Sequence, residues 1–383
     1  MNRYVIKYGG KSIATIDKIK SIATYIIERK NKGDSLVIVL SAMADNTNTL
    51  LALANEVAII PNRRDLDLLL ATGEVISISL MSILLNELGY SAIALMGFQA
   101  GIITSGEHTK SEIVDIDVKK IESYLDNNRA VIVAGFQGIN KAGDITTLGR
   151  GGSDTTAVAL AAKLKCPCEI YTDVDGIYKV DPKEYKHAKK IDKISYKDMK
   201  TFAYLGAKVM EPRSIEIGEK YNVEIKVGNM NGEGTYITSK DIKNQEITGI
   251  AINEKLLYVR LKLNDVNQYI IINELINEKI NVDQINYSKK QITFIIDSND
   301  LVLIEKIISK YPNVKKYSDE IIRISLVGKM IRSNKVILEV LNVLNDNNVL
   351  YHEIKLLESS LSIITSIKLK SQVVELLAKH FNL

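Results

Sequence analysis

Near its N-terminal end, this 383-residue chain reads Tyr4-Val5-Ile6-Lys7-Tyr8-Gly9-Gly10-Lys11-Ser12. The apolar pattern predicts a strand over residues 4–8 and a helix over residues 12–30. Glycines between a strand and a helix let the backbone approach a ligand closely, and a helix N-terminus attracts phosphate. A P-loop is excluded, because that motif requires a glycine where Val5 stands. The turn is therefore either a phosphate site or an ordinary connection between a strand and a helix.

The same alternation continues along the first 230 or so residues. Short apolar runs predict buried strands at residues 36–40, 130–134 and 169–172. Longer apolar patterns predict helices at residues 50–60 and 75–88. Buried strands separated by helices indicate an α/β fold, a three-layer sandwich with a mainly parallel central sheet.

The pattern changes at a turn-rich stretch, residues 228–234, which we interpret as the end of a first domain spanning residues 1–232. Beyond it, strands become amphipathic and the order strand, helix, strand occurs twice. This repeat predicts two α+β modules, whose strands can intertwine. They span residues 245–315 and 316–383, with strands at 257–263, 292–296, 321–326 and 361–367 and helices at 269–277 and 335–344.

The overall composition is that of an ordinary globular protein. Lys and Arg number 50 against 46 Asp and Glu, and a net charge of +4 is too small to indicate a nucleic-acid partner. The two cysteines, Cys166 and Cys168, exclude a disulfide framework, and their spacing fits neither a redox nor a zinc motif. No uninterrupted apolar run approaches the roughly 18 residues of a membrane span. We therefore expect a cytoplasmic protein without a membrane partner.

A second motif occupies residues 143–156 and surrounds Arg150 with glycines. A helix is predicted directly after it, with Ser153 or Asp154 as the cap. An arginine in such a loop can bind a carboxylate or phosphate with two hydrogen bonds, each worth about 1.5–3 kcal/mol. The alternative is a flexible loop before an ordinary helix, but the density of special residues favours an anion site.

A third motif, residues 171–183, follows a predicted buried strand, where open α/β sheets bind ligands. Thr172 and Asp173 can bond a base or ribose, and Lys179 and Lys183 can meet phosphates; the alternative is a surface turn. An EF-hand is excluded because the required final Glu is absent.

Two weaker candidates remain open. Glu74 either belongs to the site or complements the dipole of the helix it opens, and residues 106–110 form either a site wall or a simple loop.

Together these segments resemble the aspartate kinase family, within the amino-acid kinase fold. The similarity lies in residues 7–10, 146–154, 171–182 and 206–210, and extends over essentially the whole chain. It implies that the two C-terminal modules are similar to ACT domains, the amino-acid sensors of that family. It also implies phosphorylation of the L-aspartate side chain by ATP, giving 4-phospho-L-aspartate for lysine (diaminopimelate), threonine and methionine synthesis.

The resemblance further implies a role for each matching residue. The catalytic residues would be Lys7, Arg150 and Asp154. Aspartate would be bound by Thr47, Glu74, Arg150, Gly151, Gly152, Ser153 and Asp154. ATP would be bound by Lys7, Tyr8, Gly9, Gly10, Ser41, Thr172, Asp173, Tyr178, Lys179, Asp181, Lys183, Lys208 and Val209. An effector would meet Asp265, Asn281 and Asp283. Mg²⁺ would be held mainly by the ATP phosphates, with no direct protein ligand.

Several residues depart from the family pattern. Lys11 stands where the family usually has Thr or Ser, and it either replaces or assists Lys7. Lys183 stands where many members have Arg, and Glu211 where many have His or Gln. The turn that usually carries Pro and Gly in the first module reads Asp265-Val266-Asn267-Gln268, which leaves feedback by lysine or threonine open.

Two other functions remain as alternatives. One is a kinase of the same fold acting on glutamate or acetylglutamate, and the other is a non-catalytic amino-acid sensor. Because ACT modules usually pair edge to edge across subunits, a homodimer or larger homo-oligomer is expected.

Overall fold

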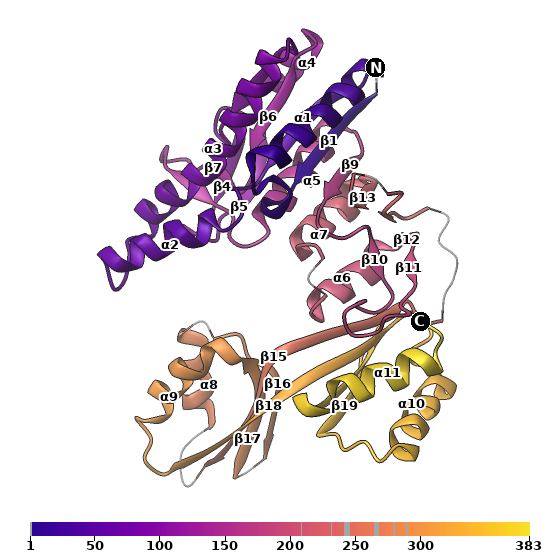
Figure 1. The fold of residues 1–383 in the computed structure, drawn as a ribbon. Helices are drawn as coiled ribbons and strands as arrows, with labels where there is room; N and C mark the ends of the chain where they lie inside the picture. Colours follow the sequence, from indigo (N-terminus) through magenta and orange to yellow (C-terminus); the bar gives the residue numbers. More distant parts are fainter. Residues whose placement is uncertain are drawn as a thin grey trace. The chain divides into compact units, whose positions relative to one another are not determined.

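The computed structural model describes residues 2–207, 209–230, 232–240, 246–263, 268–278, 280–288 and 290–383. Two compact units share these residues (Figure 1). The first unit comprises residues 1–177, 190–203 and 208–243, and the second comprises residues 178–189, 204–207 and 244–383.

The first unit is built on an eight-stranded sheet in the order β12-β14-β13-β9-β1-β2-β6-β3. The run from β13 to β3 is parallel throughout, and β13 with β14 forms an antiparallel pair. This arrangement confirms the mainly parallel sheet predicted from the buried apolar runs. The strands are β1 (Arg3–Tyr8), β2 (Ser35–Leu40), β3 (Ala92–Leu95), β6 (Ala130–Ala134), β9 (Cys168–Tyr171), β12 (Lys193–Ile194), β13 (Ile225–Gly228) and β14 (Thr235–Ile237).

Helices lie on both faces of this sheet. On one face, α1 (Ile16–Asn31) and α3 (Arg63–Glu87) form a hydrophobic core with alternate residues of β1, β2 and β6, among them Ile6 and Ile38. Because side chains alternate along a strand, Lys7 points to the other face, against which α5 (Gly152–Leu164) packs. The remaining helices are α2 (Asn46–Val57), α4 (Lys119–Asp126), α6 (Tyr196–Tyr204) and α7 (Pro212–Tyr221).

A second, four-stranded sheet of short strands completes the first unit, in the order β5-β4-β7-β8. Its strands are β4 (Ile102–Ser105), β5 (Glu112–Ile116), β7 (Gln137–Ile139) and β8 (Ile145–Thr147). No pattern in the sequence predicted this sheet. It matters for the site because β8 leads directly into the glycine-rich loop around Arg150. Two further short strands are β10 (Ile177–Tyr178) and β11 (Lys190–Ile191).

The structure corrects three helix starts. The helix predicted from residue 12 begins at Ile16, with Thr15 as its cap, because a short 3-10 helix, η1 (Gly10–Ile13), comes first. The helix predicted from residue 75 begins at Arg63, so Glu74 lies in its middle rather than at its start. The helix after the Arg150 loop is preceded by Gly151 in a left-handed conformation, with φ of 70°, so neither Ser153 nor Asp154 is its cap.

Among the described residues, α3 alone is long and apolar enough by composition to cross a membrane, with a mean hydropathy of 2.1 over an 18-residue window. Half of that window is buried inside the protein. Asp67 and Glu74 interrupt the apolar sequence, and Leu70, Ile78 and Met81 are buried. The helix therefore packs as the core helix of the first unit.

The second unit contains one antiparallel sheet in the order β16-β17-β15-β18-β20-β19. Its two longest strands, β15 (Gly249–Leu263) and β18 (Val314–Val327), pair along nearly their full length. The outer strands are β16 (Asp283–Ser288), β17 (Gln291–Asp297), β19 (Glu353–Leu356) and β20 (Ser360–Ser366).

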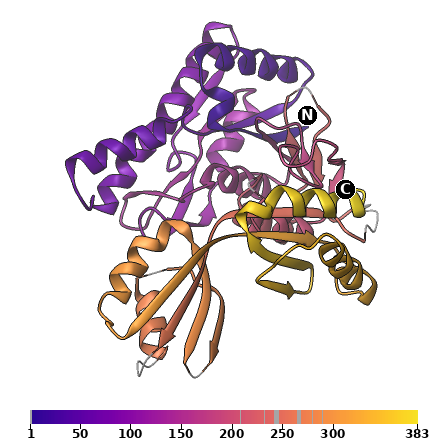
Figure 2. The ribbon, with the colours of Figure 1, turned by 60° about the horizontal axis from the view of Figure 1, so that its bottom comes forward.

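Two pairs of helices pack on this sheet, at opposite ends in both views (Figures 1 and 2). At one end, α8 (Gln268–Asn277) and α9 (Leu301–Ile308) enclose a core that includes Phe294. At the other end, α10 (Asn334–Asp346) and α11 (Lys370–His380) enclose a core that also takes in Val180. Two short 3-10 helices, η2 (Ser298–Asp300) and η3 (Ile367–Leu369), precede α9 and α11.

Candidate active site

The candidate site lies at the carboxyl ends of four adjacent parallel strands, β9, β1, β2 and β6. The residues that follow these strands are Thr172, Gly9, Ser41 and Gly135. In open α/β sheets, ligands bind at this edge, where the chain connections diverge to opposite sides. Three of the four belong to motifs selected from the sequence, or to the residues implied by the resemblance.

A short ion pair joins Lys7 to Asp154. The Lys7 Nζ atom lies 2.6 Å from Asp154 Oδ1, and the side chains are only 12% and 11% exposed. Lys7 comes from β1 and Asp154 from the first turn of α5. The pairing holds the lysine ammonium near the carboxyl end of the sheet, where a phosphate can approach it.

The turn after β1 is packed closely against the turn after β2. A Cβ atom added to Gly10 would lie 2.6 Å from the Ala42 carbonyl oxygen, so no side chain fits there. The Ala44 N–H donates to the Gly10 carbonyl over 3.1 Å. The Gly9 N–H donates to the Tyr171 carbonyl at the end of β9, over 3.3 Å. Backbone from three strands therefore converges at one point, without bulky side chains.

Lys11 connects the turn after β1 with the segment after β9. Its Nζ donates to Asp173 Oδ2 over 3.1 Å, and the Thr172 hydroxyl donates to the other oxygen of the same carboxylate. The Lys11 ammonium holds the pKa of the Asp173 carboxyl below its usual value. Both side chains of the ion pair are mostly exposed. The structure thus places this unusual lysine beside the segment implied to bind ATP.

Glu74 is a buried carboxyl group in the middle of α3. It is 3% exposed, and its Oε1 accepts a hydrogen bond from the Ala42 N–H over 3.0 Å. Among the residues that the structure describes, Oε2 has no hydrogen-bond partner. Burial raises the pKa of Glu74 to about 8. A ligand cation that reached Oε2 would satisfy this atom and favour the ionised form.

The loop that carries Arg150 is fixed through its backbone atoms rather than through the Arg150 side chain. Gly149 and Gly151 have φ of 75° and 70°, the left-handed conformation that glycine adopts without strain. From the start of α7, Arg213 Nη2 donates to the Leu148 carbonyl over 2.7 Å and to the Arg150 carbonyl over 3.3 Å. The Arg150 side chain itself is exposed. The loop is thus fixed while its guanidinium remains accessible to a ligand.

Glu211 contributes to holding this loop. Its Oε1 accepts a hydrogen bond from Arg213 Nε over 3.2 Å. A Cβ atom on Gly151 would lie 2.6 Å from the Glu211 Cβ, so the two residues are in close contact. The position that departs from the family pattern therefore supports the arginine that holds the loop.

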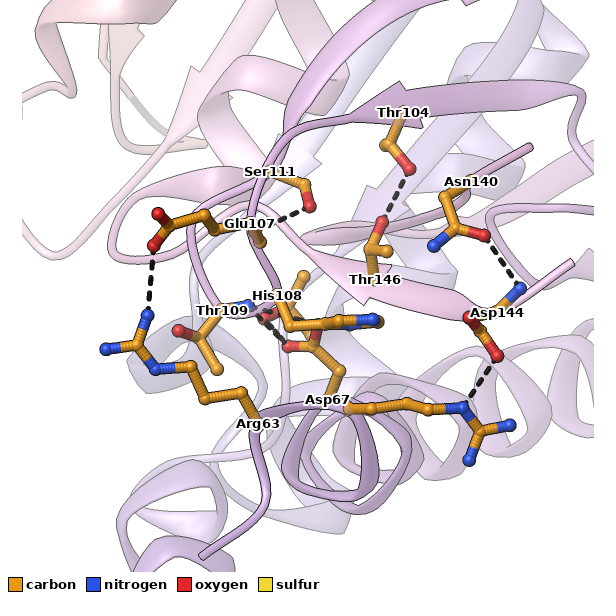
Figure 3. A network of polar contacts seen from close by, with 12 residues as sticks. Arg63, Asp67, Thr104, Glu107, His108, Thr109, Ser111, Asn140, Asp144 and Thr146 are labelled. Atoms are coloured by element: carbon orange, nitrogen blue, oxygen red, sulfur yellow. Dashed lines mark hydrogen bonds and ion pairs between the residues drawn. The ribbon is translucent and has the colours of Figure 1, made fainter. Parts of the chain in front are cut away.

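Sequence reasoning missed two residues near the site. Phe136 follows Gly135 after β6 and has φ of 70°, which is rare for an aromatic residue and is often found at functional sites. A Cβ atom on Gly152 would lie 3.0 Å from its ring. Asp67 is fully buried on α3 and accepts hydrogen bonds from His108, Thr109 and Thr147 (Figure 3). No motif in the sequence indicated either residue.

The other residues implied to bind substrate and nucleotide lie as follows in the first unit. Thr47 is half-buried in the first turn of α2, and the Ser41 N–H donates to the Tyr8 carbonyl over 3.3 Å. The Tyr8 ring is fully buried in the hydrophobic core, so only its backbone lies at the sheet edge. Ser153 packs beside Gly135. Val209 is half-buried in a turn.

The remaining implied residues lie in the second unit or outside the described residues. Tyr178, Lys179, Asp181 and Lys183 belong to the second unit, and burial lowers the pKa of Lys179. Asn281 is exposed, and Asp283 forms an ion pair with Arg323 and lies 3.9 Å from Lys355 Nζ. Lys208 and Asp265 lie outside the described residues. In the part of the chain that the structure describes, no three His, Cys, Asp or Glu side chains cluster as metal ligands would.

Comparison with known proteins identifies the family. Residues 2–229 match the model of the amino acid kinase family. The chain is 38% identical over 400 residues to an aspartokinase of Geobacillus stearothermophilus, covering 100% of this chain and 98% of the relative. It is 36% identical over 401 residues to aspartokinase 2 of Bacillus subtilis, with the same coverage.

Solved structures share the fold. Aspartokinase III of E. coli, determined in complex with aspartate and ADP, aligns with a TM-score of 0.82 at 23% identity, covering 98% of this chain and 99% of that chain. The aspartate kinase of Synechocystis aligns with a TM-score of 0.57 at 29% identity, covering 100% of this chain and 69% of that one. The central sheet, its helices and the shared C-terminal sheet are thus the architecture of these enzymes. This chain belongs to the aspartokinase family.

Proposed function

We propose that this chain transfers the γ-phosphate of ATP to the side-chain carboxylate of L-aspartate, forming 4-phospho-L-aspartate and ADP. Full-length similarity to aspartokinases supports this assignment. The structural observation that carries it is the paired cation of Lys7 at the edge of the sheet, together with buried Glu74, whose Oε2 has no hydrogen-bond partner among the described residues. One group suits a phosphate, and the other suits the ammonium of an amino acid.

The chemistry requires positioning more than proton transfer. The acceptor carboxylate is already ionised at pH 7, so no general base is needed. One of its oxygens forms a bond to the γ-phosphorus, while the bond from that phosphorus to the bridging oxygen breaks and ADP leaves. Because both reactants are anions, the site has to neutralise charge and align them. Lys7, held by Asp154, would meet the transferred phosphate, with Gly9, Gly10 and Ser41 around it.

Aspartate would be held by its two α-substituents. Arg150, on an anchored loop, would bind the α-carboxylate, and Glu74 would bind the ammonium. Thr47 and the Gly151-Gly152-Ser153 segment would line the same space. This arrangement leaves the side-chain carboxylate directed towards the phosphate.

ATP would be bound by the segment after β9, where Thr172 and Asp173 belong to the first unit. Mg²⁺ held by the ATP phosphates would neutralise part of their charge and orient the γ-phosphate.

The second unit would sense an end-product amino acid such as lysine or threonine, with Asn281 and Asp283 at the effector site. The sheet of this unit ends in β16 and β19, whose outer edges have no neighbouring strand among the described residues. Such edges favour pairing with a second copy, so a cytoplasmic homodimer or larger homo-oligomer is expected. Sedimentation that found only monomer at micromolar concentration would contradict this expectation.

The test is an assay with ATP, Mg²⁺, aspartate and hydroxylamine, which traps the acyl phosphate as a hydroxamate. Replacing Arg150 with Gln should raise the KM for aspartate by about tenfold or more, because a charge-assisted contact is lost. Replacing Arg129 with Gln is the control, since Arg129 lies over the Tyr124 ring and was not assigned to the site. Activity on glutamate but not on aspartate, or an unchanged KM in the Arg150 variant, would refute the proposal.

A further inference from the structure

Asp67 lies at the centre of a buried hydrogen-bond network outside the residues assigned above (Figure 3). Its carboxylate accepts from the Thr147 hydroxyl over 2.5 Å and from the Thr109 N–H over 3.0 Å. It also lies 2.7 Å from His108 Nδ1. His108 donates to this carboxyl group in the tautomer that carries its proton on Nδ1. Three donors thus satisfy a carboxylate that is fully buried.

These donors come from two segments that are distant in sequence. His108 and Thr109 lie in the loop between β4 and β5, whereas Thr147 ends β8. The two segments also contact each other directly: the Ser111 N–H donates to the Thr147 carbonyl over 3.0 Å. Asp67 therefore joins α3, this loop and the end of β8 into one block.

The block connects the two groups proposed to hold aspartate. Asp67 precedes Glu74 by about two turns of the same helix. Ala71 lies between Asp67 and Glu74 on this helix, and its carbonyl accepts a hydrogen bond from Gln137 Nε2 over 2.9 Å. Strand β7, which carries Gln137, is therefore also hydrogen-bonded to α3. On the other side, Thr147 precedes Arg150 by three residues. The start of the Arg150 loop is thus tied to the helix that carries Glu74.

We propose that Asp67 is a positioning residue for aspartate. Through its bond with Thr147, it fixes the separation between Glu74 and the Arg150 loop. That separation has to match the distance between the ammonium and the α-carboxylate of the substrate. The inference rests on the proposed function, because it assigns Glu74 and Arg150 to those two substrate groups. Asp67 does not touch the reacting atoms, so its loss should weaken aspartate binding and leave ATP binding intact.

Substitutions at Thr147 test the link without introducing a buried charge. Thr147→Val keeps the shape of the side chain but removes the donor to Asp67, and it should raise the KM for aspartate by about tenfold or more. The KM for ATP should stay within about twofold. Thr147→Ser restores the hydroxyl and should restore the KM for aspartate to within about twofold of the wild type.

The neighbouring Thr146 provides a matched control. It is equally buried on the same strand, and its hydroxyl bonds to Thr104 over 2.5 Å rather than to Asp67 (Figure 3). Thr146→Val and Thr147→Val should both lower the melting temperature, because each loses a buried hydrogen bond. Only Thr147→Val should change the KM for aspartate.

The outcomes separate the inference from the proposed function. A wild-type protein without aspartate-dependent turnover would overturn both. If the wild type is active, three results for Thr147→Val would overturn the inference alone. The variant could leave the KM for aspartate unchanged, raise the KM values for aspartate and ATP equally, or change the KM for aspartate only as much as Thr146→Val does. If Thr147→Val does not fold, Asp67→Asn carries the test, since its amide offers one acceptor oxygen in place of two. The same selective rise in the KM for aspartate is expected, and its absence would overturn the inference.

Discussion

Replacing Glu74 with Gln tests the electrostatics of the site. Burial raises the pKa of this carboxyl to about 8, from an ordinary value of 4.5. At a pH between these two pKa values, Glu74 keeps its proton in the folded protein but has released it in the unfolded chain. The free energy of unfolding therefore falls as the pH rises. The stabilising contribution is complete below about pH 4.5 and is lost as the pH rises through about 8.

The size of this effect follows from the difference between the two pKa values. Each pH unit corresponds to about 1.4 kcal/mol, so a rise from 4.5 to about 8 allows a change on the order of 5 kcal/mol at most. Gln has nearly the same shape and can still accept from the Ala42 N–H, but it does not titrate. The stability of Glu74→Gln relative to the wild type should increase between pH 5 and pH 9, up to that limit.

The ionisation of Glu74 should also make substrate binding depend on pH. The aspartate ammonium pairs with Glu74 only when the carboxyl is ionised, so in the wild type the KM for aspartate should fall as the pH rises towards 8. Glu74→Gln should lose this dependence and have a KM about tenfold higher at pH 8.

Urea unfolding at pH 5 and pH 9, together with KM values between pH 6.5 and pH 8.5, would measure both effects. Glu87→Gln, an exposed change on the same helix, is the control. If the Glu74 and Glu87 variants gave the same pH dependence of stability, the reasoning about the buried carboxyl would be wrong.

Three further predictions concern the neighbouring charges. Lys7→Met should lower kcat at least about 100-fold and the free energy of unfolding by about 3 kcal/mol, because Asp154 loses its ion-pair partner; normal turnover would contradict this. Arg213→Lys should raise the KM for aspartate several-fold without changing the KM for ATP, because one ammonium cannot replace both Nη2, which donates to two loop carbonyls, and Nε, which donates to Glu211; an unchanged KM for aspartate would show that the loop keeps its conformation without Arg213. Lys11→Thr should shift the melting temperature by less than about 2 °C and the KM for ATP by less than about threefold, since its pair with Asp173 is exposed. A tenfold rise in the KM for ATP would instead make Lys11 essential for nucleotide binding.

The central sheet could be predicted because its signal is local. The run predicted at residues 130–134 coincides with β6, since five consecutive apolar residues are buried on both faces of a parallel sheet. The Arg150 loop could be recognised for a similar reason. Gly149 and Gly151 have positive φ, and glycine at such positions is visible in the sequence itself.

The rest of the site depends on contacts that local patterns do not encode. Asp67 meets His108 and Thr147, which are 41 and 80 residues away in sequence. The first turns of α3 were missed because Arg63-Arg64-Asp65 interrupts the apolar pattern. Strands β7 and β8 have only three residues each, too few for an alternating pattern to be recognised.

The long pairing of β15 with β18 limits how the C-terminal region can be divided. A cut between residues 315 and 316, where the two modules were expected to meet, would fall inside β18 (Val314–Val327). A fragment ending there would lose most of the strand that pairs with β15 and would leave the backbone N–H and C=O groups along that edge of β15 without partners. The modules expected at residues 245–315 and 316–383 should therefore melt together in a single cooperative transition. Neither module should be soluble when it is expressed alone.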